Sequence, residues 1–309
     1  MIQALSNVLL PVMLVAGLGA VLAARFPIDQ ATMARVTLYL LSPALVLNVL
    51  LTTPVQLGEV LSMGSAYALT VAGCLGLGWL TGLGRPQAER RSLTASVGIW
   101  NSGNMGLPIA LFAFGQAGFA RATLLFLMSF VGMYVIAPFV YSAGLRGPAH
   151  AQVGAGPGTL VLNVLRLPAV WMVVLGVTLR ALHVTLPEGL SRGVELLAQA
   201  TLPVVLLSLG LQLGAGGWPR LDARVWLATA ARLIGGPLLG LGAGLLCGLR
   251  GDTLGVLVLS ASMPTAVNAL LIAREYGGDT DTVARTAFLS TLCSVLTIAA
   301  VVAALPRLA

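Results

Sequence analysis

Charged residues are scarce in this sequence. Only 9% of its 309 residues are charged, and all 17 basic residues are arginine, so lysine is missing altogether. Soluble domains carry about 25% charged residues. Together with 58% apolar residues and a mean hydropathy of +0.96, this predicts an all-α polytopic membrane protein. A membrane protein of 309 residues leaves no room for a large domain outside the bilayer.

Motifs for catalysis, nucleotide binding and metal binding are also lacking. No G-x-x-x-x-G-K-[ST] sequence is present to power transport with ATP, and no Ser/His/Asp or H-E-x-x-H constellation suggests an enzyme. The three cysteines lie inside apolar runs without metal-ligand spacing, so they are interpreted as buried free thiols, and no metal or cofactor is expected. The net charge of +7 is scattered over the chain, which argues against nucleic-acid binding.

Apolar runs long enough to span a bilayer follow one another along the whole chain. The first run is too long for a signal peptide and lacks a basic leading region, so we interpret it as a retained helix. A spanning helix needs about 20 mostly apolar residues. By this measure ten spans are predicted, at residues 2–24, 31–51, 60–83, 93–115, 121–144, 160–182, 189–213, 224–249, 253–275 and 282–304.

The arginines predict how the chain is oriented. If the N-terminus is non-cytoplasmic, the cytoplasmic ends of the spans hold eleven arginines and the opposite ends hold five. Cytoplasmic loops carry the excess of positive charge in membrane proteins. We therefore expect both termini on the non-cytoplasmic side. The all-arginine basic set and the absence of organelle-targeting features suggest a bacterial inner (plasma) membrane.

The two halves of the sequence resemble each other, and a Gly/Pro-rich linker at 146–158 separates them. Each half has a Pro-containing helix, then an interrupted helix, then a glycine turn into a similar start (A-R-A-T-L-L at 120–125, A-R-T-A-F-L at 284–289). Since five spans is an odd number, the second half must lie upside down. The prediction is a five-plus-five inverted repeat, with residues 1–150 as the first repeat and 151–309 as the second. The alternative is chance similarity between apolar segments.

Two apolar stretches, residues 98–114 and 257–273, cannot be unbroken helices. Glycines and a proline weaken each helix where polar residues also lie. Broken backbone at membrane depth is tolerated only where protein or a cavity satisfies it, and it marks binding sites in transporters. We predict that the fourth and ninth helices are broken and crossed. The candidate substrate-binding residues in these stretches are Asn101, Asn104, Gly106, Pro108, Pro264, Thr265 and Asn268.

The chemistry expected at these breaks is anion binding. Pro108 and Pro264 are each placed to begin a half-helix, whose N-terminus would direct unpaired N–H groups and a positive dipole end at the midplane. The asparagines and Thr265 would add donors. The alternative is that these polar residues only cap broken backbone. The breaks themselves contain no carboxylate, which favours an organic anion over a sodium ion.

Two charged residues within predicted spans are candidates for charge coupling. Glu195 is either a protonation site or an interfacial side chain that reaches water, and Arg232 either attracts the anion or braces the scaffold. The small-residue spacing of Gly240, Gly244 and Gly248 is typical of close helix packing, with a homodimer interface as the alternative.

At these residues the chain resembles the auxin efflux carrier family. The matching motifs are N-S-G-N-M-G-L-P (101–108), S-L-G (208–210), R-L-I-G-G-P (232–237), G-L-R-G (248–251), M-P-T-A-V-N (263–268) and A-R-E-Y-G (273–277). The resemblance implies the ten-helix inverted-repeat fold shared with bile-acid/sodium symporters, with a scaffold and a transport domain. It also implies substrate contact at Asn101 and at the backbone beside both prolines. Asn268 stands where plant members have a second proline.

The function expected from residues and resemblance together is secondary transport of a small organic anion by alternating access. The anion would be auxin-like or a dicarboxylate, moved by efflux, uniport or proton-linked transport through a lipid bilayer. Two alternatives are left open at this point. One is a sodium-coupled symporter of the same fold, and the other is a membrane sensor that does not transport.

Overall fold

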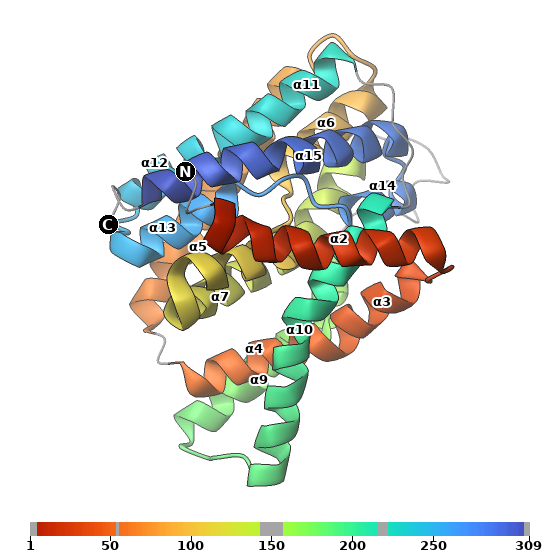
Figure 1. Ribbon diagram of the computed structural model, residues 1–309. Helices are drawn as coiled ribbons and strands as arrows, with labels where there is room; N and C mark the ends of the chain where they lie inside the picture. The colour runs from red at the N-terminus through yellow and green to blue at the C-terminus, as the bar shows by residue number, and fades with distance from the viewer. Residues whose placement is uncertain (1–4, 54–55, 143–156, 215–221, 306–309) are drawn as a thin grey trace.

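The computed structural model describes residues 5–53, 56–142, 157–214 and 222–305, and within these ranges the chain is helical without any β-strand. The α-helices carry the labels of Figure 1, and four π-helical turns have labels of their own, η1 to η4. In chain order they are η1 (Leu5–Leu9), α2 (Leu10–Arg25), α3 (Gln30–Val36), η2 (Thr37–Leu41), α4 (Ser42–Thr52), α5 (Leu57–Thr81), α6 (Gln87–Gly98), η3 (Ser102–Gly106), α7 (Leu107–Ser142), α8 (Pro157–Leu165), α9 (Pro168–Ala181), α10 (Glu188–Gly214), α11 (Ala223–Ala230), η4 (Ala231–Gly235), α12 (Gly236–Leu246), α13 (Gly251–Ala261), α14 (Ala269–Glu275) and α15 (Thr280–Ala304).

Seven of the helical segments that the structure describes are long and apolar enough to cross a membrane. The predicted all-α membrane class is therefore confirmed. The segments are Ser6–Arg25, Gln30–Thr52, Leu57–Thr81, Ser102–Tyr141, Glu188–Gln212, Ala223–Leu246 and Thr280–Ala304.

The other predicted spans are present as shorter pieces. The sixth is divided into α8 and α9, and the ninth into α13 and α14. The fourth consists of α6, η3 and the start of α7, which then runs on into the fifth. Within α7, Gly115 has φ 65° and ψ −160°, so the helical backbone is interrupted there. A positive φ of this kind favours glycine. The ten-span count and its inverted repeat stay predictions, and the linker between the halves lies mostly outside the described residues.

The helices pack in two groups (Figure 1). Long α10 packs along α2 and across α4, and α4 in turn packs against α9. In the second group α5 packs on α6 and α12, α12 on α13, and α15 on α6 and α11. Helix α7 and turn η3 contact both groups, since η3 packs on α10 and α7 on α4 and α13. The crossing of the broken helices therefore lies beside the boundary between the groups.

Within the first group, α2 and α10 touch through their backbones. A Cβ atom at Gly210 would overlap Ala16 O and would lie 2.8 Å from Ala20 N, and one at Gly19 would overlap Leu207 O. Small residues allow such close approach in membrane proteins, where packing rather than the hydrophobic effect holds helices together.

Replacing Gly210 by alanine is expected to push α2 and α10 apart and to destabilise the protein by about 1–3 kcal/mol, the usual effect of overpacking. Gly17 is a matched control, because a Cβ there meets nothing within 4 Å. Gly17→Ala should leave the melting temperature unchanged or raise it slightly, since alanine is the better helix former. Equal melting temperatures for the two variants in detergent would contradict the tight crossing.

Candidate functional site

The two interrupted helices meet at their breaks. Between α6 and η3 the chain is extended, and Trp100 pairs with Thr265 in an isolated antiparallel bridge. Asn101 N–H donates to Pro264 O at 2.8 Å, and Ala266 N–H donates to Ile99 O at 3.1 Å. Each break thus satisfies the polar backbone of the other, which is what an interrupted helix at membrane depth requires.

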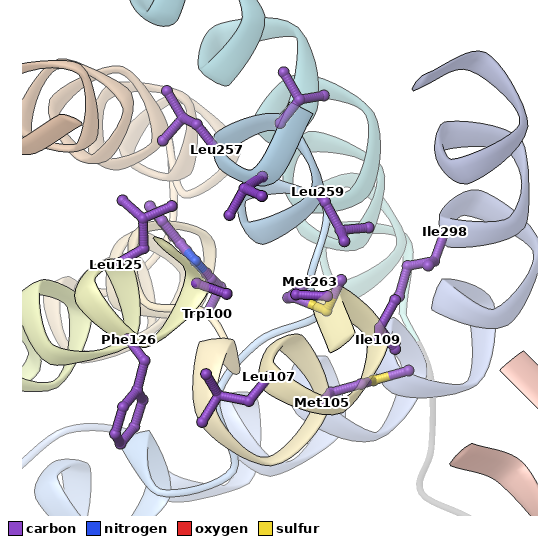
Figure 2. Packing of buried hydrophobic residues seen from close by; sticks show 14 of the residues in the cluster. Trp100, Met105, Leu107, Ile109, Leu125, Phe126, Leu257, Leu259, Met263 and Ile298 are labelled. Carbon is purple, nitrogen blue, oxygen red and sulfur yellow. The ribbon is translucent and has the colours of Figure 1, made fainter. Parts of the chain in front are cut away.

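Apolar side chains fill the space around this bridge. Trp100, Met105, Leu259 and Met263 belong to the main core cluster and gather where the two breaks meet (Figure 2). The Trp100 ring is only 2% exposed. It lies against Tyr67 with ring centroids 5.3 Å apart, and its Nε1 donates to Ser260 Oγ at 3.2 Å. Trp100 therefore packs at the crossing, and it also borders the cavity beside it.

A cavity of about 520 Å³ opens beside the crossing. Asn101, Asn104 and Asn268 line it, whereas Gly106, Pro108, Pro264 and Thr265 do not. The structure thus places three of the seven candidate substrate-binding residues on the cavity wall.

Asn101 is a buried residue on the cavity wall. This residue caps the half-helix that begins at Ser102, because its Oδ1 accepts from Asn104 N–H at 3.2 Å. A backbone N–H can only donate, so Nδ2 is the atom left for other contacts. Asn101 is 6% exposed, and its Nδ2 has no hydrogen-bond partner among the described residues. An unpaired buried donor on a cavity wall is suited to a ligand oxygen.

The predicted starts of the half-helices are correct only in part. The α-helix α7 begins at Leu107, one residue before Pro108, but the π-helical turn η3, capped by Asn101, precedes it from Ser102. The second half-helix begins at Ala269, and Pro264 stays in the extended segment, where its carbonyl accepts from Asn101 N–H. Thr265 is fully buried and donates through Oγ1 to Ser96 O at 2.7 Å. Both residues hold the crossing together from outside the cavity.

The remaining candidates lie apart from one another. Glu195 is on an exposed face of α10, where its Oε1 accepts from Gln199 Nε2 at 3.1 Å. Arg232 is fully buried; its guanidinium lies beside the Trp100 ring, with Cζ 4.7 Å from the ring centroid. Neither side chain lines the cavity. An added Cβ at Gly106 would approach Met263 Cγ at 3.4 Å, so Gly106 serves packing.

Several lining residues were missed from the sequence. Thr201, Ser208 and Gln212 lie on the face of α10 that borders the cavity, and their spacing of seven and four residues could have revealed that shared face. Ser208 Oγ and Gln212 Oε1 have no hydrogen-bond partner among the described residues. They add polar groups from α10 to the cavity wall.

An aromatic wall along α7 borders the same cavity. Phe126, Phe130 and Tyr134 follow each other at four-residue spacing and all line it. Their rings touch in sequence, with centroids 5.6 Å and 5.3 Å apart. The lining also includes two exposed charged residues, Arg35 and Glu275. The cavity wall therefore combines buried amide side chains, an aromatic surface and exposed charges.

An ion pair lies where the start of α5, the middle of α7 and the start of α13 meet. Arg121 Nε lies 2.6 Å from Glu59 Oε1, and Thr253 Oγ1 donates to the same oxygen at 2.8 Å. These contacts join α5, α7 and α13. A separate hollow there, of about 340 Å³, shares no lining residue with the main cavity. The cavity at the crossing therefore does not reach the Glu59–Arg121 ion pair.

Comparison with known proteins agrees with the resemblance noted from the motifs. Residues 158–302 match a family model described as membrane transport protein. An uncharacterized transporter of Methanothermobacter thermautotrophicus is 28% identical over 231 residues, which cover 74% of this chain and 72% of that protein.

Two further relatives have names that mention a substrate. A putative malonate transporter of Rhizobium meliloti is 29% identical over 64% of this chain and 62% of its own length, just under two thirds. Auxin efflux carrier component 4 of Arabidopsis thaliana is 31% identical over 98 residues, 30% of this chain and 16% of that protein. With its apolar helices and these relatives, the chain is a multi-pass membrane transporter that matches the membrane transport protein family over residues 158–302, just under half of its length, and is similar to the auxin efflux carriers.

Proposed function

We propose that this protein is a secondary carrier of a small organic anion. The observation that carries the proposal is the unpaired Nδ2 of Asn101, a buried residue that lines the cavity. A carboxylate oxygen there would accept from Asn101 beside the positive end of the half-helix that starts at Ser102. Asn104 and Asn268 would shape the rest of the pocket. An anion would thereby be held without a formal positive charge in the crossing itself.

The aromatic wall supports a substrate with an apolar body as well as a carboxylate. Phe126 and Phe130 would pack against that body while Asn101 holds the charged end. The relatives' names extend the range to dicarboxylates such as malonate and to auxin. We therefore keep both auxin-like monocarboxylates and small dicarboxylates as substrates of this carrier.

Alternating access is the mechanism that this arrangement supports. The carrier would have ten spans in two inverted repeats, residues 1–150 and 151–309, with its N-terminus outside a bacterial inner membrane. The group of helices that holds the crossing would move against the group built on α2, α4 and α10. Opening the far side would break the Glu59–Arg121 contact, and closing the near side would bring Arg35 and Glu275 together.

The test is uptake into liposomes that contain the purified protein. Indole-3-acetate and malonate are offered separately, each with and without sodium and proton gradients. Saturable uptake of either anion, absent from protein-free liposomes, is expected, and its gradient dependence identifies the coupling. Saturable binding without any movement across the bilayer would overturn the carrier proposal in favour of a sensor.

A further inference from the structure

Arg232 is a buried cation without a carboxylate partner among the described residues. It lies in η4, the π-helical turn between α11 and α12, and is 0% exposed. Arginine is a permanent cation in proteins, and burying an uncompensated charge is strongly unfavourable. None of the salt bridges in the described part of the chain includes it. Something else must therefore compensate its charge.

The compensation comes from two helix ends. Arg232 Nη1 donates to Val97 O at 2.6 Å, and Nη2 donates to Ala261 O. Val97 is the last residue but one of α6, and Ala261 is the last residue of α13. These are the half-helices that lead into the two breaks. One guanidinium thus closes the C-terminal ends of both.

The charges balance. Each helix C-terminus carries a partial charge equivalent to roughly −0.5, so two such ends meeting at one place attract one positive charge. In transporters with broken helices, half-helix C-termini of this kind are where coupling cations such as Na⁺ bind. In this protein the Arg232 guanidinium occupies the corresponding position, between the C-terminal ends of α6 and α13.

The surroundings are shaped to hold the guanidinium. An added Cβ at Gly236 would overlap both Arg232 Nη2 and Ala261 O, so glycine leaves the necessary room. The guanidinium carbon lies 4.7 Å from the centroid of the Trp100 ring, which provides a cation–π contact. Cys74 Sγ, 3.5 Å from Nη1, fills another side.

We infer that Arg232 is a tethered counter-cation, which occupies the position of a coupling ion between the C-terminal ends of α6 and α13 and makes the carrier independent of Na⁺. It acts as a positioning residue, because it holds the two half-helices in register without touching the cavity. The Na⁺ independence rests on the proposed carrier function; the occupation of the site does not. The two parts can therefore be tested separately.

The first test needs no substrate. Arg232→Gln removes the charge and keeps a donor, and its melting temperature in detergent with K⁺ as the salt should fall by about 5–10 °C. Guanidinium chloride at about 10 mM, far below denaturing concentrations, should recover about half of that loss by binding the vacated site. The matched control is Arg224→Gln, because Arg224 also donates to a helix-end carbonyl, Thr81 O at 3.1 Å, but is only partly buried. That variant should show no recovery.

A melting temperature equal to that of the wild type, or a loss that guanidinium does not recover, would overturn the counter-cation. If Arg232→Gln does not fold, Arg232→Lys decides: it retains the charge and should fold, and its failure to do so would count against the inference. The second test is uptake by the wild type in Na⁺ and in K⁺ buffers, which should be equal. Na⁺-dependent uptake would overturn the second part, whereas absence of any uptake would count against the proposed function alone.

Discussion

Replacing Asn101 by alanine should weaken binding of the transported anion about 5- to 150-fold, equivalent to about 1–3 kcal/mol for a lost polar partner in a buried site. The side chain contributes twice at this position. Its Oδ1 caps the half-helix at Ser102, and its Nδ2 is left without a hydrogen-bond partner among the described residues, in a side chain that lines the cavity. The measurement is the dissociation constant of indole-3-acetate or malonate, by calorimetry on the purified protein.

The two contributions of Asn101 can be separated with an aspartate. Asn101→Asp retains the oxygen that accepts from Asn104 N–H, and aspartate caps helices as well as asparagine does. It lacks the donor and brings a negative charge toward the bound anion. We expect a folded protein that binds at least as weakly as Asn101→Ala. Asn48→Ala, outside the cavity on α4, controls for loss of an asparagine, and wild-type binding by Asn101→Asp would refute the donor role.

Replacing Gly236 by alanine is the second change with a large expected effect. The added methyl group would have to displace the Arg232 guanidinium or push α12 away from Ala261 O. Overpacking of this kind destabilises proteins by about 1–3 kcal/mol, which corresponds to a fall of about 2–12 °C in melting temperature for a chain of this size. Loss of the Arg232 contacts would add to that fall. The measurement is thermal unfolding of the purified protein in detergent.

A glycine on the same helix provides the matched control. A Cβ added at Gly242 meets nothing within 4 Å, so Gly242→Ala should leave the melting temperature unchanged or raise it slightly. If Gly236→Ala and Gly242→Ala unfold at the same temperature, Gly236 does not provide the room for Arg232. The contrast between two alanines on α12 removes any general effect of glycine replacement.

The sequence predicts the breaks but not how they are joined. Glycines, a proline and asparagines in otherwise apolar stretches are unfavourable in unbroken helices, so the interruptions at 98–114 and 257–273 could be located from local chemistry alone. The bridge between Trp100 and Thr265 depends on backbone atoms more than 160 residues apart. Backbone atoms carry no residue-specific signal, so no motif indicates this pairing.

Predictions of individual roles depended on which rule dominated locally. Pro264 was expected to begin a half-helix because proline suits the first helical position, but the extended bridge takes precedence there. Arg232 was expected either to attract substrate or to brace the scaffold, and its contacts with Val97 O and Ala261 O favour the second role. The spacing of Thr201, Ser208 and Gln212 in the sequence predicts that they share one face of a helix, but only the fold shows that this face borders a cavity.

Because backbone atoms make the bridge between the broken helices, the side chains around it are free to diverge. Exchanging a residue at positions such as 104 or 268 alters the cavity wall while the hydrogen bonds between Asn101 N–H and Pro264 O and between Ala266 N–H and Ile99 O persist. Proteins built this way can acquire new substrates by a few substitutions without rebuilding their scaffold. Substrate preference should therefore differ between related sequences more readily than architecture does. The residues that line the cavity are then a better guide to the substrate than the name of a relative that is 28–29% identical.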